Sequence, residues 1–137
     1  MKYPEIEDFP MIMMYWKYYG ILMQNKDPEH RKETCWNMIK YARPAMEEAK
    51  EYNRQYRQAR KEAAEHFDIE YREPEYFPVV TVEPFKQYSI ICEKEGNIPE
   101  AVWACRQAIS LGFIADGTKG GMQGRLDKLM RKYNATH

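Results

Sequence analysis

The spacing of apolar residues along the chain predicts helices that are separated by short turns. Residues 9–24 are apolar on most faces, which indicates a first helix buried between neighbours. A second helix begins at Asp27 and Pro28, a side-chain cap followed by a proline in the first turn, and Pro44 ends or kinks it. A long helix then extends to about residue 67. The N-terminal half of the chain is therefore expected to be helical.

Small and aromatic residues recur on one face of the long helix. Their spacing alternates between three and four residues and draws a narrow seam: Ala49, Tyr52, Tyr56, Ala59 and Ala63. The remaining surface is Glu, Lys, Arg and Gln, which is typical of a solvated helix. Because small alanines allow close approach, this seam is one candidate face for self-association, and the Met- and aromatic-rich first helix is another.

Residues 68–84 interrupt the helical pattern with three prolines, Pro74, Pro78 and Pro84. The run from Val79 to Val82 is too short and too isolated to found a sheet. We expect an extended connector that aromatic side chains pin against the helices: Tyr71, Tyr76 and Phe77.

Residues 85–112 carry the most informative pattern in the chain. A helix over 85–95 stops at Gly96 and Asn97, and a second helix runs from Ile98 to Gly112. Two helices of this length joined by so tight a turn must pack antiparallel, as a helical hairpin. Small residues fall where the two backbones approach most closely: Ser89, Ala101 and Ala108.

This hairpin resembles a single tetratricopeptide repeat. The resemblance is carried by an aromatic residue that opens the first helix, a small residue one turn on, a turn glycine, and two small residues seven positions apart in the second helix: Phe85, Ser89, Gly96, Ala101 and Ala108. Cys92 and Cys105 depart from it, because the family usually has large aromatic residues there. The resemblance implies a non-catalytic protein-binding module whose partner contacts the exposed face of the first helix: Glu83, Lys86, Ile90, Glu93 and Lys94.

Some members of that family grip the C-terminal carboxylate of a partner with basic and asparagine side chains. Lys86 fits this arrangement, but Ile90 stands where the asparagine is expected. The carboxylate clamp is therefore not carried over to this chain.

A glycine-rich loop precedes the last helix, which is expected over residues 123–133 and would cap the open apolar edge of the hairpin. The segment from Asp116 to Leu126 is similar to the C-terminal part of small bacterial and phage proteins that have no known activity. Gly112 to Lys119 imitates a P-loop, but it reads Gly-Thr-Lys where Gly-Lys-Thr or Gly-Lys-Ser is required, and it follows a helix. Nucleotide hydrolysis is not expected, while anion binding by N–H groups of the Gly117–Gly121 loop remains an alternative.

Composition narrows the class of protein. The 137 residues carry 21 Lys+Arg and 21 Asp+Glu, and this balance argues against a protein that mainly coats nucleic acid or acidic membranes. The most apolar run, residues 11–23, is shorter than the roughly 20 residues that a bilayer span needs. The N-terminus carries acids where a secretory signal would need positive charge. We expect a cytoplasmic, all-α protein of one domain and about five helices.

The chemistry-bearing residues match no catalytic or metal-binding spacing. The three histidines are scattered, and no Cys-x-x-Cys or His-Glu-x-x-His occurs, so no metal, cofactor or catalytic residue is expected. The cysteines match no disulfide framework and are interpreted as small core residues: Cys35, Cys92 and Cys105. Glu65 and His66 beside Asp68 are more typical of a helix end than of an acid–base pair.

The sequence thus predicts one domain with three parts: helices over 9–67, the connector over 68–84, and the hairpin with its capping helix over 85–133. The leading hypothesis is binding to another protein, as a small bacterial or phage accessory or inhibitory protein that acts on a larger machine. The alternative is nucleic-acid association through basic faces of the long and last helices: Arg54, Arg57, Arg60, Arg125 and Lys128. This alternative requires the two helices to be adjacent, and glutamates of the long helix could pair with its arginines instead.

Overall fold

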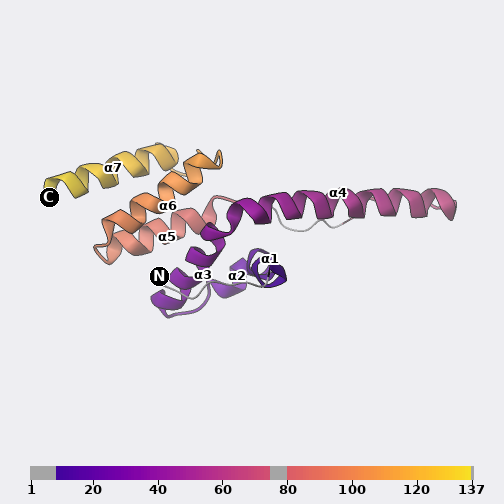
Figure 1. The fold of residues 1–137 in the computed structure, drawn as a ribbon, viewed down its shortest axis with the longest axis horizontal. Helices are drawn as coiled ribbons and strands as arrows, with labels where there is room; N and C mark the ends of the chain where they lie inside the picture. Colours follow the sequence, from indigo (N-terminus) through magenta and orange to yellow (C-terminus); the bar gives the residue numbers. More distant parts are fainter. Residues whose placement is uncertain (1–8, 75–79, 137) are drawn as a thin grey trace.

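A computed structural model of the chain describes residues 9–74 and 80–136. Within these residues it contains seven helices (Figure 1): α1 (Phe9–Lys17), α2 (Tyr19–Leu22), α3 (Pro28–Lys40), α4 (Ala42–His66), α5 (Glu83–Lys94), α6 (Ile98–Ser110) and α7 (Gly121–Thr136). The expected all-α class is confirmed, but the helices outnumber the expectation of about five.

The helix expected over residues 9–24 is in fact two helices, and that expectation was wrong. The break lies at Tyr18, whose φ and ψ of −108° and 20° depart from helical values. The N–H of Ile21 donates to the Tyr18 carbonyl at 3.0 Å, an i→i−3 bond of the tighter 3₁₀ type. The two helices differ in burial: Met13 and Trp16 of α1 lie in the core, whereas Ile21 of α2 is exposed.

Local sequence signals set the boundary between α3 and α4. The Asp27 side chain accepts a hydrogen bond from the Glu29 N–H at 3.0 Å, as expected for the cap of α3. The chain breaks at Tyr41, between the two helices, and Pro44 lies in the first turn of α4. A proline costs little there, because the first N–H groups of a helix have no partner within it.

The predicted hairpin is present as α5 and α6, which pack against each other. Gly96 adopts a φ of +81°, and the following Asn97 N–H donates to the Cys92 carbonyl at 2.8 Å. The Asn97 side chain then accepts from the Glu100 N–H at 3.4 Å and caps α6. The small residues expected between the helices are buried, as are all three cysteines: Ser89, Ala101, Ala108, Cys35, Cys92 and Cys105.

The body of the molecule is a series of packed helices. α3 packs on α5, α5 on α6 and α6 on α7, while α1 packs on α3 and on the start of α4. The largest fully buried apolar side chains come from three of these helices, α3, α5 and α7: Met38, Phe85, Tyr88, Met122 and Leu129. As expected, α7 covers the far edge of the hairpin, although it begins earlier and ends later than the predicted 123–133.

The second half of α4 leaves this body. Ala42, Ala45 and Ala49 belong to the core, but from residue 50 onward α4 projects away from the other helices (Figure 1). The connector returns along it: the Arg57 guanidinium lies 3.1 Å from the Glu73 carboxylate, and Lys61 lies 5.6 Å from the Tyr71 ring centroid. We call residues 50–74 the arm.

The seam predicted on the long helix is mostly exposed along the arm, so its role as a face for self-association stays a prediction. Of the seam residues only Ala49 is buried, while Tyr52 and Tyr56 are 52% and 37% exposed and Ala59 and Ala63 are also exposed. The connector covers a neighbouring stripe instead and buries Ala64. Tyr71 is half-buried, as expected of a pinned connector, whereas Tyr76 and Phe77 lie outside the described residues.

Within residues 9–74 and 80–136, none of the helices combines enough length with enough apolar character to cross a bilayer.

Candidate protein-binding groove

A groove of about 540 Å³ lies between α5 and the segment that joins α2 to α3. Its floor is apolar and half-buried, formed by Tyr19, Met23, Ile90 and Ile91. Its rim carries the polar and charged residues: Arg31, Glu83, Gln87, Lys94 and Glu95, with Pro28 beside them. The floor thus joins residues that are about 70 positions apart in the sequence.

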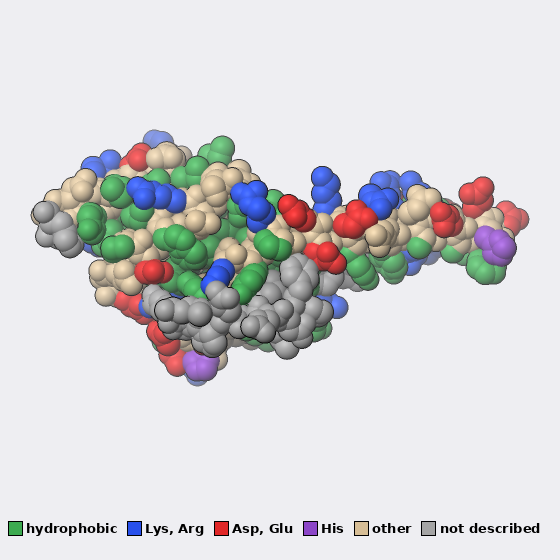
Figure 2. Space-filling view, in the orientation of Figure 1, with side chains coloured by type: hydrophobic (Ala, Val, Ile, Leu, Met, Phe, Trp, Pro, Cys, Tyr) green, Lys and Arg blue, Asp and Glu red, His purple; other side chains and the backbone are tan. Residues whose placement is uncertain are grey.

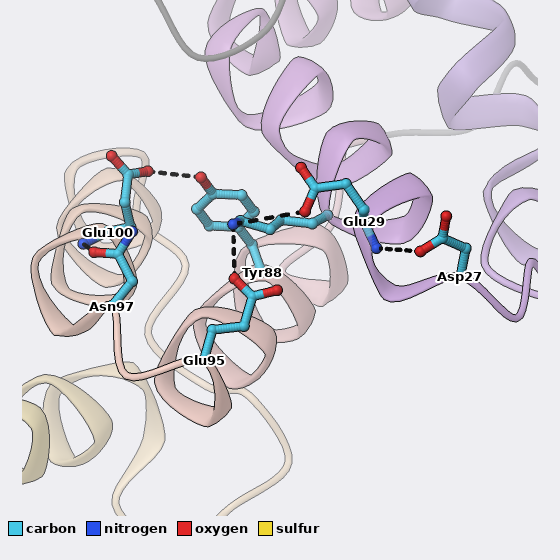
Figure 3. A network of polar contacts seen from close by, with 7 residues as sticks. Asp27, Glu29, Tyr88, Glu95, Asn97 and Glu100 are labelled. Atoms are coloured by element: carbon cyan, nitrogen blue, oxygen red, sulfur yellow. Dashed lines mark hydrogen bonds and ion pairs between the residues drawn. The ribbon is translucent and has the colours of Figure 1, made fainter.

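An ion pair between α3 and the end of α5 holds the two sides of the groove together. The Lys32 ammonium lies 2.7 Å from the Glu95 carboxylate and 4.0 Å from that of Glu29 (Figure 3). Lys32 is only 5% exposed, so its charge is largely withdrawn from water and depends on these carboxylates. The position of α5 relative to α3 is therefore fixed by a specific polar contact as well as by apolar packing.

A second polar contact fixes α5 against α6. The Tyr88 hydroxyl donates to the Glu100 carboxylate at 2.6 Å (Figure 3). The Tyr88 ring also meets the Trp103 ring edge-on, with 5.8 Å between the ring centroids. Burial and the hydrogen bond to Glu100 raise the pKa of Tyr88, so its hydroxyl remains a donor. The helix that supplies most of the groove lining is thus held from both sides.

The layer beneath the groove is uncharged at neutral pH. Burial raises the pKa of the Cys35 thiol to about 12, the nearby Cys92 adds to the rise, and Arg31 opposes it. Burial also raises the pKa of Tyr19, whose ring forms part of the floor. The Cys35 sulfur lies 3.7 Å from the sulfur of Met23, another floor residue. All ionised groups of the groove therefore lie on its rim.

The structure divides the five residues predicted to contact a partner between two flanks of α5. Glu83, Ile90 and Lys94 line the groove. Lys86 and Glu93 lie on the opposite flank: the Lys86 ammonium is beside Gly117, and Glu93 is 3.5 Å from Lys132 of α7.

Sequence reasoning missed the groove residues that come from the N-terminal helices: Tyr19, Met23 and Arg31. No spacing rule relates them to α5, because only the packing of α3 on α5 brings the two regions together. The break after α1 contributes as well, since α2 and the turn after it direct Tyr19 and Met23 toward α3 and α5.

The glycine-rich loop is organised by a buried ion pair. The Asp116 carboxylate accepts from the Arg125 Nε at 3.0 Å, from the Thr118 N–H at 2.9 Å and from the Thr118 hydroxyl. Burial favours the neutral form of Asp116, but these hydrogen bonds from Thr118 and Arg125 outweigh it and lower the pKa. A hollow of about 470 Å³ beside this loop is lined by residues that include Lys119 and Lys128.

The residues of the nucleic-acid alternative do not form one face. Arg54, Arg57 and Arg60 lie on the arm, whereas α7 packs on α6 at the other end of the body (Figure 1). Acidic and basic side chains are interspersed along the arm (Figure 2). The adjacency of the two helices that this alternative requires is therefore absent.

Several of these basic groups are also engaged within the chain. Arg54 lies 2.6 Å from Glu51, whose pKa it helps to lower to about 2, and Arg57 pairs with Glu73. Arg125 is only 17% exposed at its side chain because it pairs with Asp116. Lys128, the other residue of this alternative that lies on α7, is exposed.

Neither metal chemistry nor relatives add evidence on function. Within residues 9–74 and 80–136, no group of three or more His, Cys, Asp or Glu could hold a metal ion. Comparisons of the chain with protein-family models, curated proteins and solved structures found no match. The geometry of the chain itself is therefore the basis for a functional proposal.

Proposed function

We propose that this protein is a non-catalytic protein-binding module and that its groove binds a segment of another protein. The observation that carries the proposal is an apolar, half-buried floor with charged groups confined to the rim. Binding sites in proteins commonly combine these features, because burial supplies affinity and a few polar groups supply orientation. A single Leu or Ile of the partner, fully buried on this floor, would contribute about 1.5–3 kcal/mol.

The fixed position of α5 supports the same proposal. The contacts of Lys32 with Glu95 and of Tyr88 with Glu100 hold this helix before any partner arrives. A preorganised surface loses little conformational entropy on binding, so more of the contact free energy remains as affinity.

The resemblance of residues 85–112 to a tetratricopeptide repeat supports the choice of face. In that family the exposed face of the first helix is the contact surface, and here Glu83, Ile90 and Lys94 of that helix line the groove. The similarity of the segment after Asp116 to small bacterial and phage proteins supports the narrower proposal of an accessory or inhibitory protein that acts on a larger machine.

The test is selection from a random peptide library displayed on phage, followed by a substitution on the groove floor. Ile90→Asp places a carboxylate where a partner side chain would be buried, so selected peptides are expected to bind at least about tenfold more weakly. Titration calorimetry or fluorescence anisotropy measures this change, and circular dichroism checks that helicity is kept.

Ile114→Asp is the matched control, since Ile114 is 67% exposed and lies outside the groove. This variant is expected to bind the selected peptides as the unmodified protein does. Failure to enrich any peptide, or equal binding by the Ile90→Asp variant, would refute the proposed function.

A further inference from the structure

The groove contains a positively charged group whose hydrogen-bonding capacity is not used within the described part of the chain. The Arg31 Nε is buried and has no hydrogen-bond acceptor among the described residues, and Arg31 forms no ion pair with any of them. Buried donors are nearly always satisfied, and an unsatisfied charged donor is unfavourable. Arg31 as a whole is half-buried and lines the groove, so the accessible part of its side chain can pair with an acceptor on a bound ligand.

The charges around the groove are unevenly distributed. Lys32 neutralises Glu95 at 2.7 Å, and this pair joins the start of α3 to the end of α5. Arg31, next to Lys32, and Lys94, next to Glu95, therefore lie toward the same end of the groove. Glu83, the remaining acidic residue of the lining, is in the first turn of α5, about 16 Å away along the helix. The groove has a basic end, an apolar floor and an acidic end.

We propose that the groove binds a partner segment in which an aspartate or glutamate side chain lies close in sequence to a large apolar residue. The carboxylate pairs with Arg31 at the basic end, and the apolar side chain rests on Ile90 and Ile91. A guanidinium fork matches a carboxylate in two parallel hydrogen bonds, which makes arginine better suited than lysine to this role. This inference rests on the proposed function and adds the chemistry of the partner.

The charge pattern also gives the direction of the segment relative to α5. A basic residue of the partner beyond the apolar one is expected to approach Glu83, while the acidic residue approaches Arg31. Opposite orientation would place like charges together at both ends and is disfavoured.

The experiment uses the peptides selected on the full-length protein in a double-mutant cycle. The protein variant is Arg31→Gln, and the peptide variant replaces its acidic residue with the corresponding amide. We expect each change alone to weaken binding at least about tenfold and the two together to weaken it little further, because both remove the same contact. Arg43→Gln, in the first turn of α4 and outside the groove lining, is the matched control and is expected to have no effect.

Each outcome bears on the inference separately from the proposed function. Peptides that depend on Ile90 but lack an acidic residue, or that bind the Arg31→Gln variant normally, would overturn the inference and leave the groove as a binding site. Loss of binding on amidation of the peptide C-terminus, but not on the side-chain change, would also overturn it. If Arg31→Gln unfolds the protein, Arg31→Lys is the second variant, with partial retention of acid-dependent affinity expected.

Discussion

Gly121 is a residue whose identity the structure restricts strongly. Its φ is +64°, and a Cβ built on it would lie 2.5 Å from the carbonyl oxygen of Ile114. The close approach exists because the next residue, Met122, donates its N–H to that same carbonyl at 2.8 Å. This bond attaches the start of α7 to the segment that follows the hairpin.

Gly121→Ala is therefore expected to lower the free energy of unfolding by about 1–3 kcal/mol, because it combines backbone strain with a steric overlap against main-chain atoms. Gly124→Ala is the matched control within α7, because apart from the neighbouring backbone of its own helix no atom lies within 4 Å of the added Cβ. This second change is expected to raise stability by about 0.5–1 kcal/mol, since alanine is the better helix former. Urea denaturation of both variants measures the difference, and equal effects would contradict the argument.

Asp116 makes stability depend on pH in a defined direction. Its folded-state pKa lies below the ordinary value of 3.8, so the ionised carboxylate favours folding. That contribution is fully present above the unfolded-state pKa and is lost as pH falls through the lower, folded-state pKa.

Asp116→Asn removes this contribution and leaves Arg125 without its carboxylate partner. We expect the variant to be less stable than the unmodified protein at neutral pH, by about 1–3 kcal/mol, and the gap to narrow as pH falls below about 4. Thermal or urea unfolding across this pH range measures the gap, with Asp127→Asn, an exposed residue of α7, as control. A gap that stays constant with pH would contradict this assignment.

Among the elements, α4 has two environments along one continuous helix. Sequence periodicity predicts the helix itself, since the three- and four-residue spacing is intrinsic to its geometry. The periodicity does not predict what covers the apolar face of α4, because the cover depends on where α1 ends and where the connector returns. Ala49 is buried and Ala59 is exposed, although both belong to the same pattern.

The same contrast explains which parts of the fold and site the sequence predicted. The hairpin turn was predicted because Gly96 and Asn97 act locally, through a positive φ and a side-chain cap. The contribution of Ile90 to the groove followed from its place on α5. The place of Arg31 in the groove lining was not predicted, because it arises only when α3 packs on α5 across a long sequence separation.

The arm is expected to contribute little to the stability of the body. None of its described side chains belongs to the main core cluster: in sequence order, the member after Ala49 is Val80. The Arg57 guanidinium lies 3.1 Å from the Glu73 carboxylate, so these two residues are close enough in space for a short linker to join them. Replacement of residues 58–72 by a short Gly-Ser linker is expected to change the free energy of unfolding by less than about 1 kcal/mol.

Ala45→Asp tests the opposite environment on the same helix. Ala45 is fully buried, so a carboxylate there is expected to destabilise the protein by several kcal/mol, on the order of 3 or more. Calorimetric melting of the two variants compares the two halves of α4. A large loss of stability on shortening the arm would show that it is part of the cooperative unit.

At the scale of the whole molecule, α5 is the helix that connects the main features of the structure, because the groove, the hairpin and a contact with α7 all involve it. It packs on α3 and on α6, lines the groove on one flank and approaches α7 and the glycine-rich loop on the other. The predicted contact residues all lie on this helix, and only the packed structure shows on which flank each of them lies. A change at one flank, such as Ile90→Asp, can therefore be compared with one at the other without leaving this helix.

The arm also determines how the molecule moves through solution. Its helical part, residues 50–66, extends about 25 Å from a body built from the remaining short helices (Figure 1). A rod attached to a globule experiences more friction than a sphere of equal mass, so a single chain elutes from a size-exclusion column earlier than compact proteins of 137 residues. Early elution is thus expected of the monomer itself, and light scattering, which reports mass independently of friction, is the measurement that distinguishes it from a dimer.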